Sequence, residues 1–182
     1  AKQKIAELAA ELIMDGDTLI LDASSTALFI AQKIKTKKDI TLLTNSLEVL
    51  MELSDVTGWK ILSTGGSLKE RSCALIGSQA EECLERFHVD KAFISCKGVD
   101  AEHGFSDSSD ADAAVKRKMI AAASQVFFAV DSSKFGKLSF SSISGFSGVD
   151  AVITENCPNE DWNRLFIAND IECIYPRGNG NG

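Results

Sequence analysis

Apolar positions recur along the chain in two alternating patterns, which predict helices and strands in turn. Near the N-terminus, positions 5, 8, 9, 12 and 13 are apolar at helical spacing, and the polar segment 15–17 ends this helix before the apolar run at 18–21. Further helices are predicted around 28–34, 46–53, 78–87, 111–123 and 160–168. Further short apolar strands are predicted at 40–43, 60–63, 92–95, 126–130, 151–153 and 171–175.

Short apolar strands that alternate with helices predict an α/β fold. Parallel neighbours need crossover connections, and their sheets are buried on both faces. We therefore expect a three-layer sandwich in which helices cover both faces of a mostly parallel sheet. No linker rich in Pro, Gly or Ser interrupts the chain before residue 176, so residues 1–176 are expected to form one main domain. The polar, Gly-rich segment 177–182 is expected to be a flexible tail.

Charge and composition narrow the classes of function. The 182 residues include 26 acidic and 19 basic side chains, which gives a net charge of −7. Because DNA-binding modules concentrate Lys and Arg on one face, this chain is not expected to hold DNA by itself. No apolar run approaches the ~20 residues of a membrane span. The five cysteines are widely spaced, without a C-x-x-C pair. These features predict a cytoplasmic protein with reduced thiols and no membrane partner.

Ligands of open α/β sheets bind beyond the carboxyl ends of the strands, so the residues that follow each strand are the candidate site. Ser24, Ser25 and Thr26 follow the first strand and precede a helix. At such a junction, unpaired backbone N–H groups and the helix dipole attract an anion. The segment therefore has the outline of a phosphate site. The alternative is that Ser25 or Thr26 only caps the helix.

The next two strands end in similar small residues. Thr44 and Asn45 follow the second strand and allow the same two interpretations. Gly65 and Gly66 follow the third strand, where they either shape the site or form a turn that requires positive φ.

Three lysines are candidates for the charge that such a site needs. An acidic protein that binds a phosphorylated ligand must concentrate positive charge around it. Lys97 and Lys134 each follow a predicted strand. Lys116 lies in a helix beside Lys118, and a solvated surface position is the stronger interpretation for it.

The common enzyme signatures are missing. The sequence contains no dinucleotide-binding glycine motif, Walker A loop, nucleophile elbow or zinc-protease motif, and it predicts neither a cofactor nor a metal. His88 is expected at the surface, whereas His103, in the loop after a strand, could reach a ligand. Asp107, Asp110 and Asp112 do not have the spacing of a calcium-binding loop and favour a helix N-terminus instead.

Eight short motifs, in order and at fitting spacing, resemble the C-terminal effector-sensing domain of the DeoR family of bacterial transcriptional regulators. They are ILDASST at 20–26, LTNS at 43–46, TGG at 64–66, LIG at 75–77, DKAF at 90–93, KGVD at 97–100, GFS at 104–106 and VDSSKFG at 130–136. The resemblance implies a fold related to ribose-5-phosphate isomerases and CoA-transferases, and a crevice that binds a phosphorylated sugar. It also implies a repressor that works as a homo-oligomer. In that family a winged helix-turn-helix domain precedes the sensor and contacts DNA. That domain is absent from this sequence, so we expect the chain to be part of a longer regulator that reaches DNA only through it.

Departures from the isomerases favour a sensor over an enzyme. Those enzymes carry an acidic segment after the fourth strand, where this chain has Cys96, Lys97 and Gly98, and their catalytic Glu aligns with Arg117. Because aldose–ketose isomerisation needs a carboxylate to move the proton, we expect no catalysis. One departure concerns the regulators themselves, since Ala23 stands where they more often have Ser or Gly.

The sequence thus supports one hypothesis and two alternatives. We expect a sensor whose hydroxyl residues hold the phosphate, whose lysines at strand ends pair with its charge, and whose Asp107 and Lys116 meet the sugar hydroxyls. The alternatives are a sugar-phosphate isomerase of the same fold and an interaction module that has lost its ligand. The candidate ligand-binding residues are Asp22, Ser24, Ser25, Thr26, Thr44, Asn45, Gly65, Gly66, Lys97, Gly98, Asp107, Lys116 and Lys134.

Overall fold

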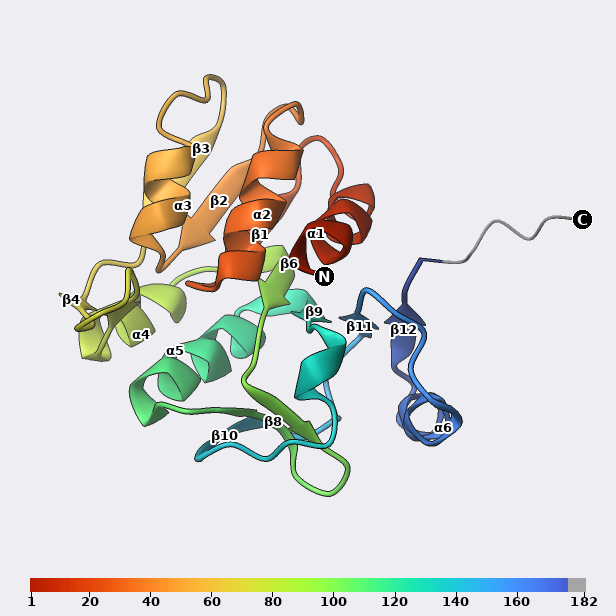
Figure 1. Cartoon of the computed structure of the whole chain (residues 1–182). Helices are drawn as coiled ribbons and strands as arrows, with labels where there is room; N and C mark the ends of the chain where they lie inside the picture. The colour runs from red at the N-terminus through yellow and green to blue at the C-terminus, as the bar shows by residue number, and fades with distance from the viewer. Residues whose placement is uncertain (177–182) are drawn as a thin grey trace, which may run out of the picture.

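A parallel sheet of seven strands forms the centre of the computed structural model, which describes residues 1–176 (Figure 1). The strand order is β12 (Glu172–Ile174), β11 (Ala151–Ile153), β9 (Ala123–Ala129), β6 (Val89–Ile94), β1 (Thr18–Leu21), β2 (Thr41–Thr44) and β3 (Lys60–Ser63). Each neighbouring pair runs parallel. The expected parallel sheet is confirmed, and the carboxyl ends of all seven strands lie along one edge.

Helices cover both faces of this sheet, as the sequence pattern predicts. On one face, α1 (Lys2–Glu11), α2 (Ser25–Ile34) and α3 (Leu47–Glu52) pack on Leu19 and Leu21 of β1. On the other face, α4 (Ser78–Leu84), α5 (Asp110–Ala121) and α6 (Glu160–Ala168) belong to the apolar cluster that contains Ile20. Successive residues of a strand point to opposite faces, so a wholly apolar strand supplies both clusters. The three-layer α/β sandwich is confirmed.

Two small antiparallel sheets lie outside this frame, in segments where the sequence pattern predicts only loops. One is a hairpin of β4 (Ser67–Leu68) and β5 (Leu75–Ile76). The other joins β7 (Gly98–Asp100), β8 (Gly104–Asp107) and β10 (Ser141–Ser144). These strands are two to four residues long and rich in Ser and Gly, so they lack the apolar alternation that marks a strand. A 3-10 turn, Ser132–Lys134, follows β9.

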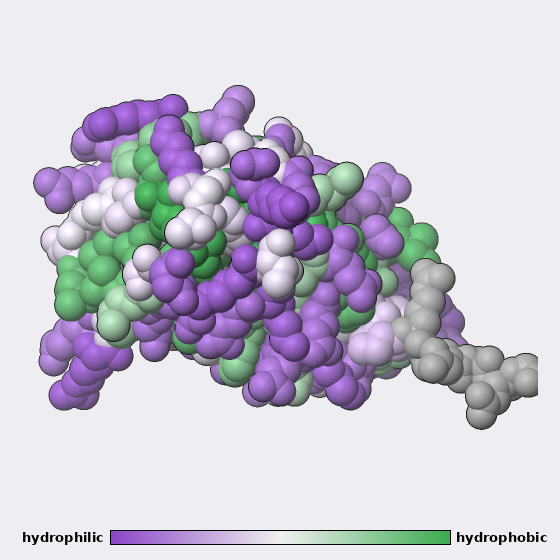
Figure 2. Space-filling view, turned by 90° about the horizontal axis from the view of Figure 1, so that it is seen from above, coloured by the Kyte–Doolittle hydropathy of each residue, from purple (hydrophilic) through white to green (hydrophobic). Residues whose placement is uncertain are grey.

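The surface is mainly polar. Viewed from above, hydrophilic residues cover most of the visible face, and apolar residues show in smaller patches between them (Figure 2). None of the helices between residues 1 and 176 is long and apolar enough to cross a membrane. The predicted flexible tail, 177–182, lies outside the described residues.

Candidate functional site

A polar pocket of about 330 Å³ lies at the carboxyl ends of β9, β6, β1 and β2. Its lining includes residues that directly follow these strands, together with side chains from the β4–β5 hairpin and from the segment that joins β8 to α5. Neighbouring strands are about 4.8 Å apart, so the four strand ends span roughly 14 Å. The pocket is large enough for a small metabolite.

The N-terminus of α2 faces the pocket through Ser24, Ser25 and Thr26. Ser24 is the N-cap, and its hydroxyl accepts a hydrogen bond from the Ala27 N–H at 3.1 Å. The helix is thus capped by Ser24, and not by Ser25 or Thr26 as the sequence suggested. Within residues 1–176, the N–H groups of Ser25 and Thr26 have no acceptor. Unpaired N–H groups at the positive end of a ten-residue helix can receive an anion.

The carboxylate of Asp22 fixes the backbone at this junction. Asp22 is 1% exposed, and its carboxylate accepts the Ser24 N–H at 3.2 Å and the Ser95 N–H at 2.9 Å. Because Ser95 follows β6 and Ser24 follows β1, the carboxylate ties two neighbouring strand ends together. Asp22 does not line the pocket but fixes the backbone that does.

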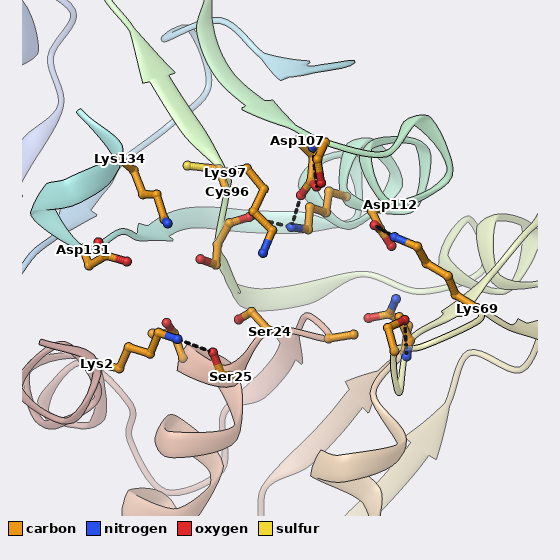
Figure 3. A pocket seen from close by; sticks show the side chains of 18 residues that line it. Lys2, Ser24, Ser25, Lys69, Cys96, Lys97, Asp107, Asp112, Asp131 and Lys134 are labelled. Carbon is orange, nitrogen blue, oxygen red and sulfur yellow. Dashed lines mark hydrogen bonds and ion pairs between the residues drawn. The ribbon is translucent and has the colours of Figure 1, made fainter. Parts of the chain in front are cut away.

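Three lysines gather at one end of the pocket (Figure 3). Lys97 and Lys134 lie where the strand-end rule places them, and neither ammonium has an ion-pair or hydrogen-bond partner in the part of the chain that the structure describes. Lys2, at the start of α1, donates to the Ser25 hydroxyl at 2.7 Å. The net charge of the chain is −7, so these three lysines form a locally positive region in an acidic protein.

Lys116 lies inside the protein, and the expectation that it is solvated is wrong. Its side chain is 12% exposed, and Nζ lies 2.7 Å from Asp107 Oδ2, 2.8 Å from the Ser95 carbonyl and 3.4 Å from Asp22 Oδ2. Burial alone would lower the pKa of Lys116, but the two carboxylates outweigh it and raise the pKa to about 12. Two N–H donors of the ammonium group form hydrogen bonds with Asp107 and the Ser95 carbonyl, and Asp22 adds an ion-pair contact.

The far end of the pocket is closed by the β4–β5 hairpin. Lys69 of the hairpin forms an ion pair with Asp112 of α5 (Figure 3). Asn45 joins the hairpin to β2. Its Nδ2 donates to the Leu75 carbonyl at 2.9 Å, and its backbone carbonyl accepts the Leu75 N–H at 2.7 Å. Asn45 lines the pocket and is 4% exposed. Its Oδ1 is the one buried side-chain polar atom without a partner in residues 1–176.

The structure brings eight of the thirteen candidate residues into the pocket lining. These eight are Ser24, Ser25, Thr26, Asn45, Lys97, Asp107, Lys116 and Lys134. Besides Asp22, the residues outside the lining are Thr44, Gly65, Gly66 and Gly98. Thr44 is buried and donates its hydroxyl to the Leu21 carbonyl at 2.7 Å, which holds β2 to β1.

The three glycines serve the backbone around the site. Gly65 and Gly66 have φ of +66° and +110° and form the turn that leads into the hairpin. A Cβ at Gly66 would lie 2.5 Å from the Ile76 carbonyl oxygen, and one at Gly98 would lie 2.3 Å from that of Lys137. These positions need glycine for close approach of two backbones.

Several lining residues have no strand-end signal in the sequence. They include Lys2, Lys69, Ser72 and Asp112, which come from helices and from the hairpin. Ser95, Cys96 and Asp131 do follow main strands, but the sequence reading gave them no ligand role. Burial raises the pKa of the Cys96 thiol to about 12, so this thiol stays protonated at neutral pH.

The remaining polar candidates lie away from the pocket or serve a helix. His88 is exposed, as expected. His103 is also exposed and lies 2.7 Å from Asp100 in the turn between β7 and β8; it does not line the pocket. Asp110 and Asp112 occupy the first turn of α5, as expected, whereas the expectation was wrong for Asp107, which is the last residue of β8. No group of three potential metal-ligating side chains occurs within the described chain.

Solved structures define the fold class. A ribose 5-phosphate isomerase A from Methanocaldococcus jannaschii superposes with a TM-score of 0.54 at 18% identity, over 75% of this chain and 55% of that one. The eIF2B delta subunit of Chaetomium thermophilum gives a TM-score of 0.59 at 19% identity, over 84% and 54%. The protein therefore has the α/β fold that these isomerases and eIF2B subunits share.

Sequence comparison identifies the family. The family model described as the DeoR C terminal sensor domain matches residues 1–156. The chain is 42% identical to the uncharacterized HTH-type transcriptional regulator YulB of Bacillus subtilis over 85% of its own length and 60% of that protein. It is 40% identical to the HTH-type transcriptional repressor GlcR of the same organism over 95% and 66%. The chain belongs to the DeoR family of transcriptional regulators and spans about three fifths to two thirds of these relatives.

Proposed function

We propose that this domain is the effector sensor of a repressor of sugar metabolism, and that its pocket binds a phosphorylated sugar. One observation carries the proposal. The unpartnered ammonium groups of Lys97 and Lys134 converge on the pocket that the N–H groups of Ser25 and Thr26 face, in a chain whose net charge is −7. A phosphate monoester carries close to two negative charges and strong acceptor oxygens at neutral pH, so it matches these donors.

The rest of the pocket suits a polyhydroxy ligand. Asp107 and the unpartnered Oδ1 of Asn45 are acceptors for sugar hydroxyl groups. Lys116 is assigned a positioning role, because it already donates to Asp107 and the Ser95 carbonyl and its charge is balanced by Asp107 and Asp22. The ribose 5-phosphate isomerases, which share this fold, are named for a phosphorylated sugar as their substrate.

Ligand binding would act on DNA indirectly. The relatives are HTH-type regulators and are longer than this chain, so a DNA-binding domain outside the present sequence would contact the operator. An effector that binds one arrangement of the homo-oligomer better than another shifts the population between them. The spacing of the DNA-binding domains would change with that population.

Titration calorimetry with pentose and hexose phosphates tests this proposal. We expect binding of at least one sugar phosphate, and its loss in Ser25→Glu, which places a carboxylate at the phosphate position. Ser124→Glu is the matched control, because Ser124 is exposed near the amino end of β9, at the opposite edge of the sheet. No binding by the unmodified domain at millimolar ligand would refute the proposal. Equal binding by the two variants would mean that the phosphate lies elsewhere.

The absence of catalysis is part of the same proposal. Of the carboxylates in the lining, Asp107 is paired with Lys116, Asp112 is paired with Lys69, and Asp131 accepts hydrogen bonds from Ser133. Arg117 lies outside the lining, beside Asp110. A general base needs a carboxylate positioned to take a proton from the substrate. A coupled isomerase assay with ribose 5-phosphate should show no turnover, and measurable turnover would favour the isomerase alternative.

A further inference from the structure

The pocket includes a lysine from the first turn of the N-terminal helix. Lys2 is the first residue of α1 and lines the pocket. Its Nζ donates a hydrogen bond to the Ser25 hydroxyl at 2.7 Å (Figure 3). Ser25 begins α2 and carries one of the two N–H groups that lack an acceptor in the described chain. An anion held at the start of α2 would therefore lie within reach of Lys2.

Lys2 also acts electrostatically on Asp131, another residue that lines the pocket. Partial burial raises the pKa of Asp131, but hydrogen bonds from Ser133 and the charges of Lys134 and, to a smaller extent, Lys2 outweigh it, so the pKa of that carboxyl is below its usual range. Lys2 and Lys134, which are far apart in the sequence, thus act on the same carboxylate. One aspartate leaves a positive excess between the two lysines, which a phosphate dianion would balance.

We propose that Lys2 is a ligand-binding residue, and that through it the occupied pocket holds the first turn of α1 in place. This inference rests on the proposed function, because it requires an anionic ligand.

The first turn of α1 has few other restraints. Residues 2–4 include no acidic side chain to favour the helix dipole. Residues 1–4 are exposed, and the buried contacts of α1 begin at Ile5 and Ala6. Local opening of such a turn costs little free energy. A ligand that bridges Lys2 to the start of α2 would add the missing restraint.

This end of α1 is also where the sensor would join the rest of a regulator. The family model describes a C-terminal sensor domain, and α1 is the first helix of the region that it matches, residues 1–156. α1 packs against α2 and contacts β9, and pocket residues lie at the start of α2 and directly after β9. Lys2 therefore supplies a direct physical contact between the effector and the direction of the incoming chain.

Lys2→Ala and Lys4→Ala form a matched pair of variants. Both residues are exposed and belong to the first turn of α1, both changes remove one positive charge, and Lys4 does not line the pocket. We expect Lys2→Ala to weaken binding of a hexose 6-phosphate and of inorganic phosphate by about 2- to 5-fold, the range of an exposed ion pair. Lys4→Ala should bind like the unmodified domain. Lys2→Gln, which keeps most of the stem, should behave like Lys2→Ala.

Hydrogen exchange of the segment 1–8 is the second readout. The Ile5 N–H bonds to the Ala1 carbonyl, so it reports on the first turn. Saturating hexose 6-phosphate should slow its exchange in the unmodified domain and in Lys4→Ala, and leave it unchanged in Lys2→Ala. Equal affinity and equal protection in both variants would overturn the inference while leaving the proposed function intact. Failure of the unmodified domain to bind either probe at millimolar concentration would overturn both.

Discussion

Lys116 and Asp107 form a largely buried ion pair in the wall of the polar pocket, in which Nζ lies 2.7 Å from Oδ2. The pair joins α5 to the end of β8, and Asp22, which is 1% exposed, completes it from β1 at 3.4 Å. An ion pair at this depth does not stabilise the fold much by itself, because desolvation offsets the attraction. Its removal on one side, however, leaves charge without compensation.

Lys116→Met should therefore destabilise the domain strongly. The substitution keeps most of the side-chain volume but leaves Asp22 and Asp107 buried without their cation, which costs about 3–5 kcal/mol in comparable sites. Lys118→Met is the control, because Lys118 lies two residues further along α5, is 37% exposed and pairs with the exposed Glu85. Its loss should cost little, because an ion pair open to solvent contributes little to stability. Urea unfolding would measure both free energies, and similar values for the two variants would contradict the structural role of Lys116.

The same group predicts a response of stability to alkaline pH. The pKa of Lys116 rises from its ordinary value of 10.5 to about 12 in the folded protein, so folding favours the protonated form. Its contribution is complete below pH 10.5 and is lost as the pH rises towards 12. The difference in unfolding free energy between the unmodified domain and Lys116→Met should stay constant from about pH 7 to pH 10 and narrow above that range. If the difference in unfolding free energy already narrowed near pH 8, its pH dependence would have to come from a group other than Lys116.

The sequence predicted the main sheet well because every central strand is apolar on both faces. Ile20 serves one cluster and Leu19 the other, and such runs cannot be mistaken for surface segments. The strand-end rule also placed Lys97 and Lys134 at the site, since parallel strands bring their carboxyl ends to one edge. These predictions needed only local pattern and general topology.

The burial of Lys116 could not be predicted in this way. Its partner Asp22 lies 94 positions away in the sequence, and a lysine within a helix gives no sign of facing inward. The small sheets were missed for a similar reason, because pairs such as Ser142 with Ser106 join polar residues from distant segments. Lys2 and Lys69 enter the pocket from outside the main sheet, beyond the reach of the strand-end rule.

Gly65 and Gly66 provide a test of backbone roles within one turn. Gly65→Ala places a methyl group in open space at φ +66°, so we expect only the cost of the left-handed conformation, about 1 kcal/mol. Gly66→Ala adds a contact of 2.5 Å with the Ile76 carbonyl at φ +110°, and should cost more than about 2 kcal/mol. Thermal unfolding of the two variants would rank them, and a Gly65→Ala domain that unfolds at the lower temperature would contradict this account.

Asn45 gives a prediction about ligand selectivity. Its Nδ2 is committed to the Leu75 carbonyl, so the amide cannot turn over without placing two oxygens together, and Oδ1 remains a buried acceptor with no partner in residues 1–176. Such an atom costs about 1–3 kcal/mol, which a hydroxyl donor from the ligand would recover. Asn45→Ala should therefore weaken binding of a hexose 6-phosphate about 10-fold or more and leave binding of inorganic phosphate nearly unchanged. Because the ratio of the two affinities is compared within one protein sample, a partial loss of folded domain does not alter it.

Lys97→Ala is the contrasting variant and should weaken the binding of both ligands alike, since it removes charge at the phosphate end. Calorimetric titration of both ligands gives the two ratios, and a ratio in Asn45→Ala equal to that of the unmodified domain would show that Oδ1 meets no hydroxyl group of this ligand.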